Sequence, residues 1–167
     1  MRSIGLDLST RTGLVVLEPG PVVRESIEVA PKSKGWVRVQ EITDTILGTI
    51  TTYSPDEVVI EGYGFANQHT LVTLAEIGSV VRYCLYLSGV AYREIPPNQL
   101  KKFVTGKGNA KKDAITLNVY KRWGYEAETD NVADAYGLAA IGLACHGALG
   151  VGVPMTCAQS EIISRVA

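Results

Sequence analysis

The stretch Ile4-Gly5-Leu6-Asp7-Leu8-Ser9-Thr10 places a single carboxylate at the end of an apolar strand. The pattern recurs in Val58-Val59-Ile60-Glu61, where a second apolar run ends on an acid. A third acid, in Asp130-Asn131-Val132-Ala133-Asp134-Ala135, stands at the start of an apolar helix. Burying an ionised carboxylate costs several kcal/mol unless a partner compensates, and a hard cation is the usual partner. The three acids therefore predict a Mg²⁺ site that the fold assembles and that is used on phosphate chemistry.

Length and composition predict an ordinary soluble globular protein. The chain has 167 residues, of which 46% are hydrophobic and 20% charged, enough for one domain with a substantial core. We expect this domain to cover residues 1–150 and a short C-terminal tail, partly disordered or packed on a partner, to cover residues 151–167. The sequence contains neither an apolar run of roughly 20 residues nor a signal-peptide pattern, so no membrane association is expected.

The three cysteines are Cys84, Cys145 and Cys157, an odd number at unrelated spacings. No Cys-x-x-Cys pair is present, so the sequence predicts neither a zinc site nor a disulfide partner. A reducing cytoplasmic location fits this usage best.

Positive charge is concentrated in one segment, although the net charge of the chain is −1. Residues 93–122 contain eight Lys or Arg and only two acids. A basic segment beside a metal-binding acidic cluster is suited to binding a phosphate backbone. A solvated helix face with lysines for solubility would give the same composition, so charge alone does not decide between the two interpretations.

Hydrophobic periodicity predicts an α/β fold. Three strands joined by tight turns open the chain, and strands then alternate with helices, which favours a mixed five-stranded sheet flanked by helices. The predicted strands cover residues 3–8, 13–17, 22–29, 57–60 and 90–95, and the predicted helices cover residues 36–53, 69–87, 98–104, 110–123 and 131–146.

These motifs together resemble the RuvC-type Holliday-junction resolvases of the ribonuclease H-like superfamily, phage-type members included. The similarity rests on Gly5-Leu6-Asp7, Val59-Ile60-Glu61, Ala133-Asp134-Ala135 and the glycine-rich stretch Thr105–Lys112. It spans roughly residues 3–147 in the family's order.

The resemblance implies a homodimer that resolves Holliday junctions by paired symmetric hydrolysis. It also implies four acidic metal ligands and two Mg²⁺ ions per subunit, with Mn²⁺ as a substitute. The catalytic, metal-binding set would be Asp7, Glu61, Asp130 and Asp134.

One position departs from the family pattern. The third ligand usually lies three residues before the last acid, and Asn131 occupies that place here. Asp130 lies four residues before Asp134, and both spacings share a helix face. Asp130 is therefore either the replacement ligand or the N-cap of the helix, while the amide oxygen of Asn131 could also bind a hard cation.

The same resemblance and the local chemistry suggest the nucleic-acid contacts. Aromatic side chains after Glu61 can stack on unpaired bases or anchor their loop on the core, and we expect at least one of them to be exposed. Lysines in the glycine-rich loop and at the following helix start would bind phosphates, and an arginine beside Asp7 would contact the scissile strand or an acid. The predicted DNA-binding residues are Arg11, Tyr63, Phe65, Lys107, Lys111 and Lys112.

Other functions remain open at this point. Nearly the same metal site could cut forks, flaps or RNA–DNA hybrids, and loss of an acid at position 131 would suit a junction-binding protein without activity. The first motif also resembles a phosphate loop of the actin-like ATPases and sugar kinases, but the chain leaves little room for their second lobe, and Glu61 and Asp134 would have no role in it.

Overall fold

The computed structural model describes residues 1–64, 68–111, 113–150 and 155–166. Its five strands are β1 (Ser3–Asp7), β2 (Thr12–Glu18), β3 (Val22–Val29), β4 (Glu57–Glu61) and β5 (Arg93–Ile95). Its helices are α1 (Gly35–Tyr53), α2 (Gln68–Leu87), α3 (Pro97–Thr105), α4 (Asp113–Trp123), α5 (Asp130–Cys145) and α6 (Cys157–Val166). Among the described residues, β5 is shorter than the strand predicted for residues 90–95. The helix predicted to begin at residue 110 begins at Asp113.

The strands form one mixed sheet in the order β3-β2-β1-β4-β5. The first three strands pair in antiparallel hairpins, while β4 is parallel to β1 and β5 is parallel to β4. β1 is therefore the central strand, buried along its whole length. The predicted mixed five-stranded sheet flanked by helices is confirmed.

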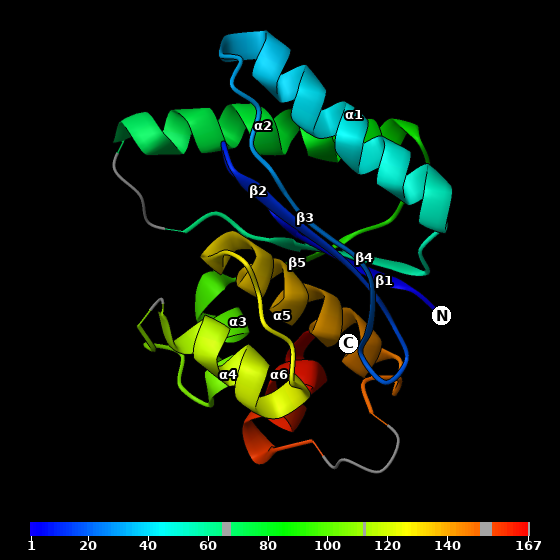
Figure 1. The fold of residues 1–167 in the computed structure, drawn as a ribbon, viewed down its shortest axis with the longest axis vertical. Helices are drawn as coiled ribbons and strands as arrows, with labels where there is room; N and C mark the ends of the chain where they lie inside the picture. Colours follow the sequence, from blue (N-terminus) through cyan, green and yellow to red (C-terminus); the bar gives the residue numbers. More distant parts are fainter. Residues whose placement is uncertain (65–67, 112, 151–154, 167) are drawn as a thin grey trace.

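Helices cover both faces of the sheet (Figure 1). α1 and α2 lie on one face, where they bury Ile42, Ile46 and Ile77 against Leu6 and Ile60 of the strands. α5 lies directly on the other face, with α3, α4 and α6 outside it (Figure 1). The alternation of strand side chains separates the two cores, since Val15 and Val59 face α5 while their neighbours in sequence face α1 and α2.

The contact between α5 and the sheet depends on glycine. A Cβ atom at Gly5 would overlap the Ala135 carbonyl oxygen, and one at Gly13 would overlap the Asn131 carbonyl oxygen. The backbone of α5 therefore approaches β1 and β2 more closely than any side chain on those positions would permit. This approach brings the first turn of α5 next to the end of β1.

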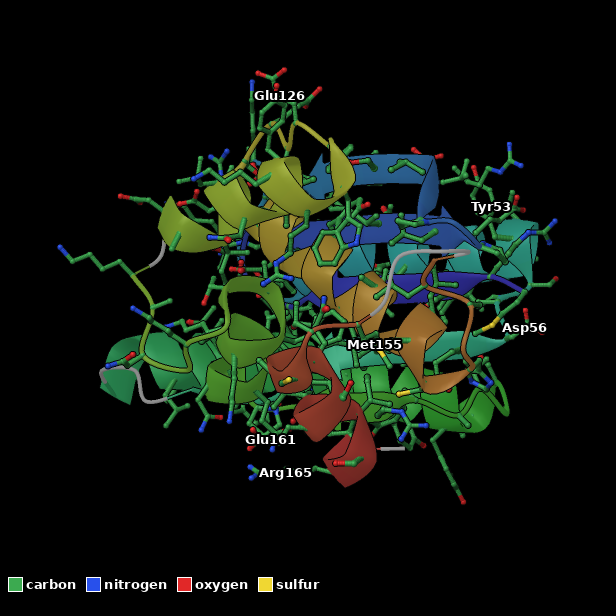
Figure 2. All side chains as sticks on the ribbon, turned by 90° about the horizontal axis from the view of Figure 1, so that it is seen from below. Tyr53, Asp56, Glu126, Met155, Glu161 and Arg165 are labelled. Atoms are coloured by element: carbon green, nitrogen blue, oxygen red, sulfur yellow. The ribbon has the colours of Figure 1, made fainter. Side chains whose placement is uncertain are left out.

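The residues after Gly150 include a packed helix. Ile162 of α6 is fully buried in the α5-side core, and Glu161 accepts a 2.7 Å hydrogen bond from Lys102 of α3. Glu161 and Arg165 lie together along α6 (Figure 2), where they form an ion pair. The predicted C-terminal tail, as far as residues 155–166 describe it, is attached to the domain.

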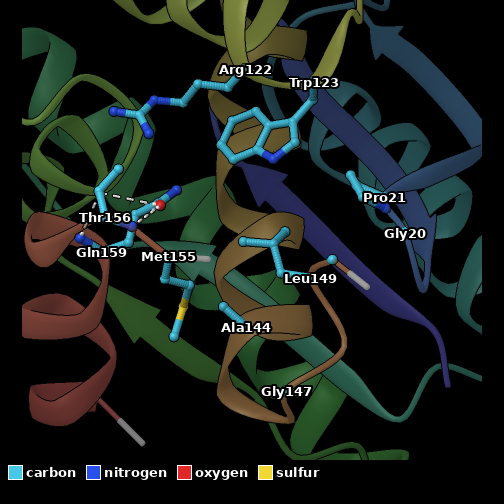
Figure 3. Close-up of a pocket in the computed structure, with 11 residues that line it drawn as sticks. Gly20, Pro21, Arg122, Trp123, Ala144, Gly147, Leu149, Met155, Thr156 and Gln159 are labelled. Carbon is cyan, nitrogen blue, oxygen red and sulfur yellow. Dashed lines mark hydrogen bonds between the residues drawn. The ribbon is translucent and has the colours of Figure 1, made fainter. Parts of the chain in front are cut away.

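A cavity of about 600 Å³ lies between the end of α5 and the start of α6 (Figure 3). Trp123, Leu149 and Met155 give it apolar walls, and Arg122 and Gln159 are its larger polar residues. None of the predicted metal ligands lines it, and the ten residues from Asp134 to Ala144 place it about 15 Å along α5 from the acids. The cavity is therefore separate from the candidate active site.

Substituting Gly5 tests the close approach of α5. We expect Gly5→Ala to lower the free energy of unfolding by about 3 kcal/mol, because the added methyl group meets helix backbone that cannot rotate away. Gly48→Ala in α1 is the matched control, since nothing lies within 4 Å of its Cβ position; it should stabilise by about 0.5–1 kcal/mol. Urea denaturation measures both, and an unchanged midpoint for Gly5→Ala would contradict the packing described.

Candidate active site

The candidate active site begins as a row of residues across the sheet. Asp7 of β1 is opposite Gly13 of β2, and Gly13 is opposite Glu28 of β3. On the other side of β1, Leu6 pairs with Ile60 of β4. The next residues of these two parallel strands, Asp7 and Glu61, are therefore neighbours. Directly opposed residues share a face of the sheet, which is the face covered by α5. Two strand-end acids predicted from sequence therefore meet here.

Asp7, Glu61 and Asp134 form an electrostatically coupled group. Burial, followed by the negative charges of Asp7 and Asp134, raises the pKa of Glu61 to about 9. A hydrogen bond between Glu61 and Asp7 adds to the rise in this pKa, and Asp7 is itself buried at 9% exposure. Lys101 of α3 is the nearby cation that acts against this shift. The fold has therefore gathered like charges in a desolvated place, which needs compensation.

The chemistry of these three acids fits a hard divalent cation. A cation between them would replace the shared proton and cancel the repulsion that raises the pKa of Glu61. Among the residues that the structure describes, no three Asp, Glu, His or Cys side chains already form a metal-binding group.

Asp130 has different surroundings. The N-cap of α5 is Thr129, whose side chain accepts a hydrogen bond from the Val132 amide, so Asp130 is not the cap. Asp130 accepts a 3.3 Å hydrogen bond from Thr116 of α4 and lines a groove beside that helix with Leu117 and other residues.

Sequence reasoning missed Glu28. Asn131 Nδ2 donates a 2.8 Å hydrogen bond to Glu28 Oε1, and Arg11 forms an ion pair with the other oxygen. Although burial acts to raise the pKa of Glu28, hydrogen bonds from Asn131, Arg11 and Thr129 lower it overall. The signal available in the sequence was an acid on strand 22–29, but only the strand register places it opposite Gly13.

The predicted DNA-binding residues differ in exposure and in contacts. Lys107 and Lys111 are exposed. Arg11 is 64% exposed although it pairs with Glu28. Tyr63 is 46% exposed, but the Arg82 guanidinium lies 4.8 Å from its ring centre, so its loop is held against α2. Phe65 and Lys112 lie outside the described residues.

Several cations of the basic segment are occupied by acids. Lys102 is bound by Glu161, and Arg93 lies 3.4 Å from Glu57. Lys101 lies close enough to the acid group for its positive charge to lower the pKa of Glu61. Among the described residues of this segment, Lys107 and Lys111 of the glycine-rich stretch and Lys121 of α4 are exposed to an external anion.

A mixed sheet with acids at the adjoining ends of β1 and β4, completed by an acid from a helix lying on that sheet, has the ribonuclease H-like fold. Residues 6–145 match the family model for the crossover junction endodeoxyribonuclease RuvC. The chain belongs to the RuvC family, and the resemblance stated from its motifs is confirmed. Nucleases of this family depend on a metal ion.

The relatives agree with this assignment. The chain is 30% identical over 152 residues to the crossover junction endodeoxyribonuclease RuvC of Brevibacillus brevis, covering 83% of this chain and 89% of the relative. It is also 30% identical to that of Gloeobacter violaceus, with 87% and 90% covered. Thermus thermophilus RuvC in complex with a Holliday junction substrate has a similar fold, with a TM-score of 0.73, 23% identity, and 83% and 90% of the chains covered.

The raised pKa of Glu61 predicts a pH-dependent stability for the metal-free protein. The folded state holds a proton on Glu61 up to about pH 9, whereas the unfolded chain releases it near its ordinary pKa, which is about 4.3. The folded state therefore binds more protons in this window, so stability falls as the pH rises through it. We expect the melting temperature to fall from pH 5 to pH 9 without metal.

The melting temperature of the Glu61→Gln variant should vary less with pH. At pH 8 it should exceed that of the wild type by about 2–4 °C for each kcal/mol of repulsion removed. Mg²⁺ should raise the wild-type melting temperature most at high pH. Differential scanning calorimetry measures these shifts, and parallel pH profiles for the two proteins would contradict the coupled acid group.

Proposed function

We propose that this chain is a divalent-metal-dependent endonuclease that resolves four-way DNA junctions by paired, symmetric phosphodiester hydrolysis. The observation that carries the proposal is the convergence of Asp7, Glu61 and Asp134 in one desolvated group within a RuvC-family fold. The proposed cofactor is Mg²⁺, two ions per subunit, with Mn²⁺ as a substitute. The proposed location is the reducing cytoplasm, in association with nucleoid or viral DNA, supported by the free cysteines of the described chain.

Each acid has a distinct role in the proposed site. Asp7, on the central strand, would help to hold both ions, while Glu61 and Asp134 would each hold one of them. The fourth ligand would come from the first turn of α5, where Asp130 and Asn131 are the candidates. When bound, the metal supplies an activated water and stabilises the charge that develops on the scissile phosphate and the leaving oxygen.

The chain's other residues would position the substrate. Backbone amides at the start of α4 and the exposed Lys107 and Lys111 are suited to phosphate oxygens. Lys101, close to Glu61, adds positive charge at the acid group itself. Tyr63 is exposed beside the acids and offers a face on which an unpaired base can stack.

A homodimer would present two such sites to the two strands of a junction. α2 carries exposed apolar residues at helical spacing, including Val72, Tyr83, Tyr86 and Leu87. Residues 72, 83, 86 and 87 fall on one face of the helix, opposite the face that buries Ile77 and Val81. Exposed apolar area on this scale suits a subunit interface.

Loss of a strand-end acid should abolish cleavage without abolishing binding. We expect Glu61→Gln to cut a labelled synthetic four-way junction at least about 100-fold more slowly in Mg²⁺, since even outer-shell changes cost 10–100-fold, while the junction is still retained in a gel-shift assay. Glu57→Gln is the matched control, because this residue lies on the same strand and face but contacts Arg93 and His146 instead.

A linear duplex, a fork and an RNA–DNA hybrid in the same assay define the substrate. Cuts in the hybrid alone would overturn the junction assignment but keep the metal chemistry. Binding of the junction without cleavage by the wild-type protein would leave a junction-binding protein and would refute the catalytic proposal.

The loop lysines should set the salt dependence of DNA binding. We expect Lys107→Gln and Lys111→Gln each to reduce the slope of log affinity against log salt by about 1, because each lysine neutralises one phosphate. Lys102→Gln should change the slope little, since Glu161 already pairs with Lys102. Fluorescence anisotropy with a catalytically inactive protein measures this, and equal slopes in all four proteins would exclude the loop from the binding surface.

A further inference from the structure

We propose that Glu28 is a positioning residue for the metal site: it binds the amide group of Asn131 and so turns Asn131 Oδ1 toward the acid group as a ligand. The inference rests on the proposed function, since it concerns how this chain completes the same site. It assigns a role to Glu28 on β3, a strand that carries none of the acids recognised by their motifs. It also selects Asn131, not Asp130, as the fourth metal ligand.

The position of Glu28 follows from the sheet. Glu28, Gly13 and Asp7 are successive members of one row, and the backbone of Asn131 lies directly on the middle member, Gly13. Asn131 therefore stands between a carboxylate on one side and the catalytic group on the other. No side chain at position 13 separates the two.

The hydrogen bond decides which way the amide faces. An ionised carboxylate only accepts hydrogen bonds, so Asn131 must present its NH₂ group to Glu28. Nδ2 and Oδ1 diverge from the same amide carbon, so the oxygen does not face Glu28, and we infer that it is turned along the row toward β1. Asn131 and Asp134 are three residues apart and share a helix face, so this oxygen and the Asp134 carboxylate can serve the same cation.

Glu28 is itself held firmly enough to act in this way. Its side chain is only 11% exposed. One oxygen accepts a hydrogen bond from the Asn131 amide and the other accepts one from the Arg11 guanidinium. These contacts hold the Glu28 carboxylate in place, and the carboxylate in turn orients the Asn131 amide.

The pair also accounts for an amide where the family usually has an acid. An aspartate at position 131 would face the Glu28 carboxylate across the 2.8 Å that now separates donor and acceptor, and two like charges at that distance repel strongly. The Asn131–Glu28 pair therefore carries one negative charge, where two carboxylates at these positions would carry two. Asp130, by comparison, is bound by Thr116 on the α4 side.

The test is a double-mutant cycle on Mn²⁺ binding by the DNA-free full-length protein. Isothermal titration calorimetry gives the affinity and thermal unfolding gives the stability of the wild type, Glu28→Gln, Asn131→Asp, and the double variant Glu28→Gln/Asn131→Asp. Glu25→Gln is the matched control, because it neutralises an acid on the same strand whose contact is Tyr53 rather than α5.

We expect Glu28→Gln to weaken Mn²⁺ binding about 10–100-fold, the usual cost of removing an outer-shell partner, while Glu25→Gln leaves it unchanged. Asn131→Asp alone should lower the melting temperature through repulsion by Glu28. The double variant should recover both stability and Mn²⁺ affinity, because the carboxylate has moved from position 28 to position 131. This recovery would distinguish positioning from a purely structural role.

A folded Glu28→Gln protein with wild-type Mn²⁺ affinity would overturn the inference. Equal effects of Asn131→Asp with and without Glu28 would also overturn it. Both outcomes leave the proposed nuclease intact if the wild type binds Mn²⁺ and cuts junctions. A wild-type protein that binds no divalent cation would instead refute the proposed function, and the inference with it.

Discussion

The close packing of α5 on β1 and β2 is the constraint on which the rest of the structure depends. Gly5 and Gly13 leave room for helix backbone where a side chain would otherwise stand. The first turn of α5 consequently reaches the sheet beside Asp7 and carries Asp134 and Asn131 with it. A wider separation would preserve the sheet but would remove Asp134 from the two strand-end acids.

This packing creates an electrostatic problem that metal binding would solve. Carboxylates at adjoining strand ends repel one another in a poorly hydrated place, and the raised pKa of Glu61 is the result. Holding these charges together in the folded protein costs stability, which is common at functional sites. Within residues 93–122, Arg93 and Lys102 are paired with acids on β4 and α6, whereas Lys107, Lys111 and Lys121 are exposed on the loop and helix that follow α3.

Under this proposal, the side chain at position 131 would rearrange the family's site while keeping its chemistry. An amide oxygen binds a hard cation as a carboxylate does but adds no charge, and a neighbouring carboxylate can supply both the charge and the orientation. Here that neighbour is on a different strand from the acids that the motifs identify. The pairing between β2 and β3 thus belongs to the candidate site as much as the motifs do.

The sequence by itself determined the class of fold, the order of the elements and the three acids Asp7, Glu61 and Asp134, because hydrophobic periodicity and isolated carboxylates at the ends of apolar segments are local signals. Three features were decided only by the tertiary structure. The strand register set Glu28 opposite Gly13, the rotation of α5 turned Asp130 to Thr116, and the approach of α6 attached residues 157–166 to the core. The physical reason is the same in each case: a pairing between residues about 15 to 100 positions apart is fixed by packing and hydrogen bonding across elements, and neither leaves a periodic trace in the local sequence.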